Sequence, residues 1–133
     1  MRNLFLNHEH ESRYLELRQK IVDLMKLGDK QVVSLAFLLS ASEDIEQKIF
    51  PYLRPNKFHY EEMFKEQEFT GETELLAKLA VLIYNGEEDF SFSALYRTLN
   101  NVNLQIALNS AYLLYRSEPS ASYQTTDTNS YIK

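Results

Sequence analysis

Apolar residues recur along most of this chain at spacings of three and four, which predicts a series of amphipathic helices. The first lies between Asn7, a good N-cap, and Gly28, which suits the position just after a helix end. Leu6 is expected to pack on the first turn, and Asp29 to cap the next helix at once, giving a hairpin with almost no loop. The apolar face of this helix is Tyr14, Leu17, Ile21, Leu24 and Met25.

The second predicted helix, residues 30–41, is apolar nearly all round, which is typical of a central helix covered on several sides. Short apolar runs are ambiguous, so a buried strand at Val32–Leu39 is the alternative. The length of the run and a capping box formed by Ser40 and Glu43 favour a helix. A third helix then begins near Glu43 and ends or kinks at Pro51.

The period weakens after Arg54, where Pro55 and Asn56 predict a turn. Tyr60–Glu66 is either a short helix or an ordered loop. Three more helices are expected at about residues 72–85 (closed by Asn85-Gly86), 91–99 and 100–115. Ser91 or Ser93 is the expected cap of the second of these, and Asn100 or Asn101 is expected to start the last. Small alanines on the last helix allow close helix–helix approach, and its inward positions are Leu104, Ala107, Leu108, Ala111 and Leu114.

These elements predict an all-α fold, a compact bundle of five to six helices in one domain over residues 1–116. An apolar share of 44% is ordinary for a globular domain. Residues 117–133 are rich in Ser, Thr, Asn and Asp and are expected to form a flexible tail.

Composition excludes several classes of chemistry. The chain has no cysteine, hence no disulfide and no thiolate metal site, which fits a reducing compartment. Its three glycines are far apart, which excludes a phosphate-binding or dinucleotide-binding loop. No apolar run approaches the ~20 residues of a membrane span. We therefore expect a cytoplasmic protein with no cofactor and no membrane partner.

The net charge of −5 is concentrated in the middle of the chain. Residues 58–96 carry nine acidic residues against only Lys65 and Lys78. Phosphate backbones require a basic face, so direct nucleic-acid binding is disfavoured. The segment is either an ordinary solvated surface or a surface that meets a basic region of another protein.

Aromatic residues cluster in the same segment, and rings flanked by acids are typical of protein-binding surfaces. The alternative is that these loops fold back over the bundle and bury their rings. The candidate protein-binding residues are Phe58, Tyr60, Glu61, Glu62, Phe64, Glu66, Phe69, Glu87, Glu88 and Phe90.

The run His8-Glu9-His10-Glu11 invites a metal hypothesis, but it lacks the His-Glu-x-x-His spacing of zinc proteases. On a helix His8 and His10 diverge by about 200°, so they cannot chelate one ion together. His59 is a candidate general base or third ligand from a separate segment. We predict no catalytic or metal-binding residue, and keep a metal-dependent enzyme using His8, His10 and His59 as an alternative.

The opening Phe5-Leu6-Asn7-His8-Glu9-His10-x-x-Arg13-Tyr14 resembles that of a family of small bacterial and phage proteins of unknown function, which begin with Phe-x-Asn-x-Glu-His. Shorter matches follow at Gly28-Asp29-Lys30, Glu43-Asp44-Ile45, Ile83-Tyr84-Asn85-Gly86 and Ala107-Leu108-Asn109. The resemblance implies a compact all-α fold and an accessory gene of a phage or mobile element, and it implies no reaction.

The leading prediction is a non-enzymatic protein-interaction or regulatory module that binds another protein. A structural homo-oligomer is a further alternative, in which a partner chain completes the apolar helix Val32–Leu39.

Overall fold

The computed structural model describes residues 4–86 and 91–116, and in these ranges it confirms the all-α prediction. A short 3₁₀ turn and a two-stranded hairpin are the only other regular elements there. The optional helix of the sequence analysis is formed, so the described residues hold seven α-helices, one more than expected. They are α1 (His8–Leu24), α2 (Asp29–Leu39), α3 (Glu43–Ile49), α4 (Tyr60–Glu66), α5 (Gly71–Asn85), α6 (Phe92–Thr98) and α7 (Asn101–Tyr115). The predicted tail, residues 117–133, lies outside the described residues.

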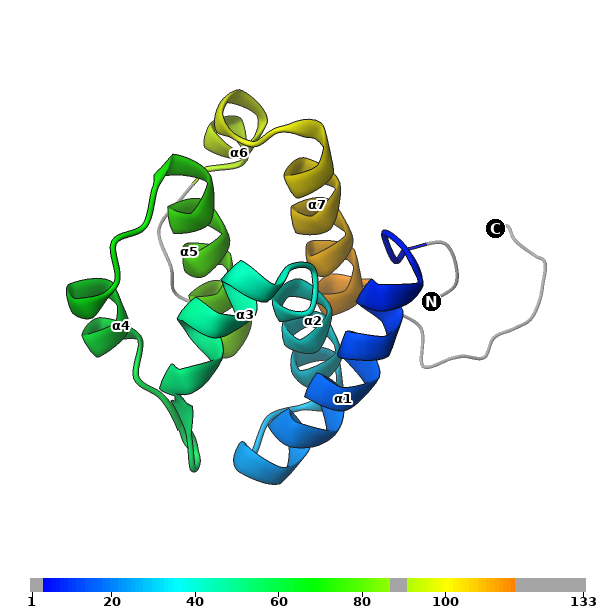
Figure 1. Ribbon diagram of the computed structural model, residues 1–133, viewed down its shortest axis with the longest axis vertical. Coiled ribbons are helices and arrows are strands. Elements are labelled where there is room, and N and C mark those ends of the chain that lie inside the picture. The colour runs from blue at the N-terminus through cyan, green and yellow to red at the C-terminus, as the bar shows by residue number, and fades with distance from the viewer. Residues whose placement is uncertain (1–3, 87–90, 117–133) are drawn as a thin grey trace.

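Helix α2 is the centre of the fold, as its all-round apolar pattern predicts, and it is a helix and not a strand (Figure 1). It packs against α1, α3, α5 and α7 of the same chain. Its residues 35–39 are completely buried. Because this chain itself covers Val32–Leu39, the reason for expecting a partner chain on that helix no longer applies.

Helix α7 packs on α2 through small side chains. Ala107 and Ser110 are buried, and the Ser34 hydroxyl donates a hydrogen bond to the Ser110 carbonyl at 2.7 Å. Of the inward positions predicted on α7, only Ala107 is buried, and the other four are half-buried. The true inner face includes Ser110, whose hydroxyl is satisfied by the Ile106 carbonyl at 2.8 Å and therefore tolerates burial.

Most helix ends follow the predicted chemistry. The side chains of Asn7 and Asn100 each accept a backbone N–H bond of 2.8 Å in the first turn of α1 and α7. Gly86 closes α5 with a φ of 76°, a left-handed conformation that glycine adopts without strain. Two predictions are wrong. Gly28 is the last residue of a four-residue connection and caps α2 in place of Asp29, which is the first residue of the helix, and α3 is capped by Ser42 instead of Ser40.

The conspicuous opening motif holds the carbonyl end of α2. Both nitrogens of the His10 ring are used: Nδ1 accepts the Leu6 N–H at 3.1 Å and Nε2 lies 3.0 Å from the Phe37 carbonyl. Since Nδ1 accepts, Nε2 carries the proton and donates it. One turn on, Arg13 Nε donates to the Ser40 carbonyl at 3.0 Å. A neutral imidazole and a guanidinium thus satisfy carbonyls that α2 leaves without helical partners.

The segment before α1 is fixed by Phe5. Its ring lies 5.1, 5.2 and 5.5 Å, centroid to centroid, from the rings of His10, Tyr14 and Phe37. Leu6, which we expected to pack on the first turn, is instead 40% exposed. The anchor of this segment is therefore one residue earlier than the staple pattern predicts.

The carbonyl groups that end helix α5 are also satisfied by a side chain from another helix. The Gln31 amide, from the first turn of α2, donates to the carbonyls of Ile83 and Tyr84 at 3.1 and 2.9 Å. Its oxygen accepts the Gly28 N–H at 3.0 Å. One side chain therefore serves the start of α2 and the end of α5.

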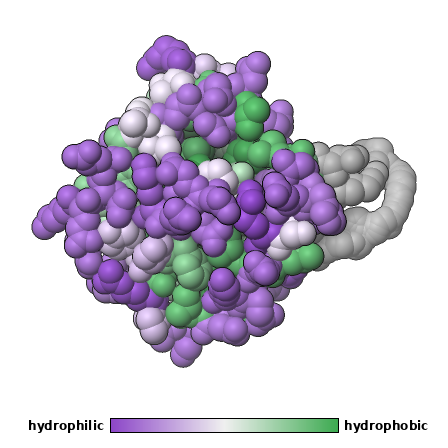
Figure 2. Space-filling view, in the orientation of Figure 1, coloured by the Kyte–Doolittle hydropathy of each residue, from purple (hydrophilic) through white to green (hydrophobic). Residues whose placement is uncertain are grey.

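Hydrophilic residues cover most of the face drawn in Figure 2, with hydrophobic residues visible in small patches between them.

Candidate functional site

The hairpin β1 (Leu53–Arg54) and β2 (Lys57–Phe58) positions the acidic and aromatic segment. The predicted turn is formed, with Asn56 at a positive φ of 64°, and its N–H donates to the Leu24 carbonyl at 2.8 Å. The chain then enters α4, which is fixed to the core by the fully buried Met63. α4 lies at the edge of the fold beside α5 (Figure 1).

Phe58, which we expected on the binding surface, is a core residue. It is fully buried, and its ring lies 5.8 Å from that of Tyr60 and 5.6 Å from that of Tyr84. The alternative given above, that the loop buries its rings, therefore holds for Phe58. Tyr60, Phe64 and Phe69 are only half-buried.

Four of the predicted residues line one open groove of about 590 Å³ between α4 and the start of α5. Across it, the Phe64 and Phe69 rings meet edge to face with centroids 5.7 Å apart. Sequence reasoning missed three lining residues, which come from the end of α4 and the outer face of α5. The groove, as we call it below, is lined by Tyr60, Glu61, Phe64, Gln67, Phe69, Glu74 and Lys78.

Two of the predicted carboxylates have structural partners instead of facing the groove. Arg54 donates two hydrogen bonds to Glu62, of 3.0 and 3.1 Å, and these hold the pKa of Glu62 below its usual value. Glu66 accepts the Tyr52 hydroxyl at 2.7 Å. Both acids therefore tie α4 to the residues before it.

The carboxylates that line the groove differ in their partners. Glu74 forms a 3.6 Å ion pair with Lys78, one turn further along α5. Glu61 is exposed and has no ion pair or hydrogen bond from its carboxylate to any residue in the described ranges. Gln67 donates to the Tyr52 hydroxyl at 3.1 Å. The remaining predicted residues, Glu87, Glu88 and Phe90, lie outside the described residues.

The three histidines are not brought together as a metal site. His10 is fully buried with both ring nitrogens bonded, and burial lowers its pKa, although the Phe37 carbonyl opposes that shift. His8 is exposed on the same helix, and His59 precedes α4. Within residues 4–86 and 91–116, no three His, Asp or Glu side chains are placed to share a metal ion.

The helices in the described part of the chain are too short or too polar to cross a membrane.

In comparisons with known proteins, the chain matches no family model, no curated protein and no solved structure. The resemblance carried by the opening motif therefore stays a prediction.

Proposed function

We propose that this protein is a non-enzymatic interaction module, which binds a basic segment of another protein in the groove between α4 and α5. The observation that carries the proposal is the combination of half-buried rings and carboxylates in one groove. Aromatic residues dominate the energetics of protein interfaces, and half-exposed rings still have area to bury. The resemblance of the opening motif supports a regulatory role in a phage or mobile element, acting in the cytoplasm.

The charge around the groove favours a basic partner. Residues 58–86 hold six acidic residues and two lysines. One of those lysines, Lys78, is already paired with Glu74. Complementary charge steers encounter and excludes acidic partners, even where each surface pair adds little affinity.

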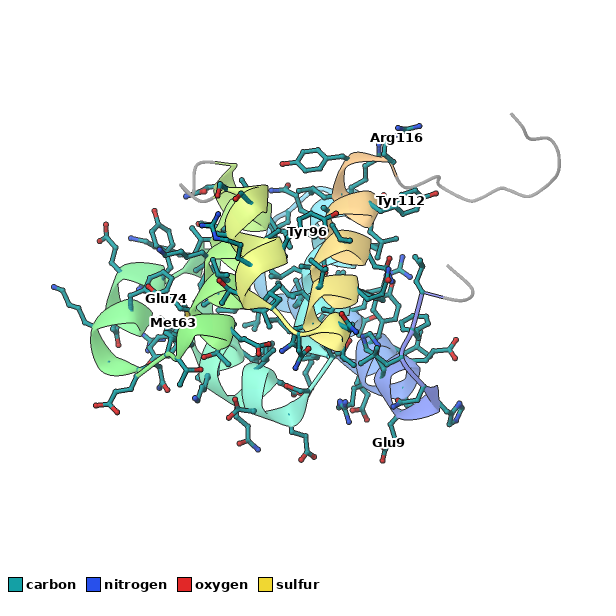
Figure 3. All side chains as sticks on the ribbon, turned by 90° about the horizontal axis from the view of Figure 1, so that it is seen from above. Glu9, Met63, Glu74, Tyr96, Tyr112 and Arg116 are labelled. Carbon is teal, nitrogen blue, oxygen red and sulfur yellow. The ribbon has the colours of Figure 1, made fainter. Side chains whose placement is uncertain are left out.

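The test is capture of a partner by two variants with the same change in net charge. The groove variant carries Glu61→Gln and Glu74→Gln, and the control variant carries Glu9→Gln and Glu16→Gln on α1. Figure 3 shows Glu74 beside α4 and Glu9 at a distant part of the surface. All four side chains are exposed, so both variants are expected to fold, which thermal melting checks.

We expect one stoichiometric partner to be captured from bacterial lysate by the wild type and by the control, and to be captured in clearly smaller amount by the groove variant. Binding of the purified partner, measured by calorimetry, should also weaken as salt rises. Equal capture by both variants would show that the groove is not the binding surface.

A further inference from the structure

We infer that the groove selects its partner segment through one arginine side chain, held between the Glu61 carboxylate and the ring pair of Phe64 and Phe69. The inference rests on the proposed function and states which side chain of the partner the groove recognises. Glu61 and Phe64 lie three residues apart on α4, which makes them neighbours on one helix face. Phe69 extends that face through its 5.7 Å ring contact with Phe64.

Two acceptors in the groove have no partner among the described residues. The Glu61 carboxylate has no partner in the described chain, and no described residue donates to the Gln67 amide oxygen. Of the lining donors, the Gln67 amide nitrogen bonds Tyr52 and Lys78 pairs with Glu74. The Tyr60 hydroxyl, in contrast, accepts from the Asn85 amide at 3.3 Å and still has its own proton to donate. A ligand made of donors therefore fits this lining better than an acidic one.

Arginine matches the groove better than lysine does. Its guanidinium is planar, stacks on aromatic faces and is more weakly hydrated than an ammonium group. It can also donate to two acceptors at once, here the oxygens of Glu61 and Gln67. An ammonium group would give up more hydration to lie beside the two phenylalanine rings.

Lys78 provides a second test, because the protein itself places this cation at the groove. Its ammonium occupies Glu74 at 3.6 Å, so only one of the two lining carboxylates is available to a ligand. Replacing Lys78 by methionine keeps the apolar stem and releases the second carboxylate. A groove that binds an arginine should therefore bind it more tightly in Lys78→Met.

The experiment is a titration of ¹⁵N-labelled full-length protein followed by amide chemical shifts. The probe is the peptide acetyl-Gly-Leu-Arg-Leu-Gly-amide, and its controls replace arginine by citrulline, a neutral isostere, or by lysine. We expect the arginine peptide to shift the signals of Glu61, Phe64 and Phe69 together with the Gln67 side-chain amide. The citrulline peptide should bind about three- to thirty-fold more weakly, the effect of one surface ion pair and one cation–π contact.

The variants decide the assignment. Glu61→Gln should remove the ion-pair part, about half, of the difference between the arginine and citrulline peptides, and Glu16→Gln on α1 should leave the difference unchanged. Lys78→Met should tighten arginine binding about two- to five-fold. Tighter binding of the lysine peptide overturns the choice of arginine.

Equal affinity for arginine and citrulline peptides, or no shift in the groove with any peptide, overturns the inference. The capture experiment is read independently, so a partner captured less only by the groove variant would still support the proposed function.

Discussion

Replacing His10 by alanine should lower the free energy of unfolding by about 4–5 kcal/mol. This loss is large for a residue whose neighbours in the sequence are mostly charged or polar. The ring is fully buried and makes hydrogen bonds to Leu6 and Phe37. Each bond contributes about 1 kcal/mol net, and truncating a buried side chain adds about 2–3 kcal/mol for lost packing. The sum is a large share of the ~5–15 kcal/mol that stabilises a typical domain.

The assay is urea unfolding followed by circular dichroism at pH 7.5, with thermal melting beside it. For a chain of this size the melting temperature should fall by about 15 °C. His8→Ala is the matched control, because His8 is the same residue type on an exposed position of the same helix, and it should change stability by less than about 0.5 kcal/mol. A loss below about 1 kcal/mol in His10→Ala, at unchanged denaturant slope, would refute the assigned role of the imidazole.

Three further predictions follow from the helix ends and from the same ring. Burial lowers the pKa of His10, so below about pH 6.5 the unfolded chain binds a proton at this residue more readily than the folded chain does. The free energy of unfolding should therefore fall as the pH is lowered from about 7 to 5.5. Urea titrations at a series of pH values should show this fall in the wild type and not in His10→Ala. Gly86→Ala should lose about 1 kcal/mol in thermal melts because φ is 76°, whereas Gly71→Ala, whose added carbon would meet only an ordinary 3.5 Å contact, should be neutral or slightly stabilising. Gln31→Glu should cost about 1–2 kcal/mol in urea unfolding, since a carboxylate would face the carbonyls that end α5; an unchanged midpoint would contradict that cap.

Local chemistry made much of this fold predictable. Asn7, Ser91 and Asn100 act as caps because a side-chain oxygen needs only the next helical turn as its partner. The pattern failed where one residue has two possible uses. Ser40 has the spacing of a cap, but its hydroxyl donates to the Phe37 carbonyl at 3.1 Å inside the end of α2. The residues within four positions of Ser40 do not distinguish a cap of α3 from a hydroxyl bonded at the end of α2.

Contacts between distant segments explain the larger misses. The role of His10 depends on a carbonyl 27 residues away, and no spacing rule reaches that far. The candidate site was predicted for its α4 side only, because Glu74 and Lys78 enter the groove through the way α5 packs beside α4. The i,i+4 spacing of those two charges indicates an exposed face of α5, but not what lies next to it.

The ends of α2 and α5 have a consequence for how the molecule opens. The carbonyls that end α2 are satisfied from α1, and those that end α5 are satisfied from α2. Helix ends ordinarily fray one by one, but here the last turn of one helix cannot loosen without breaking bonds to another. The amide protons of these three helices should therefore exchange with solvent together, at the rate of global unfolding, as one foldon.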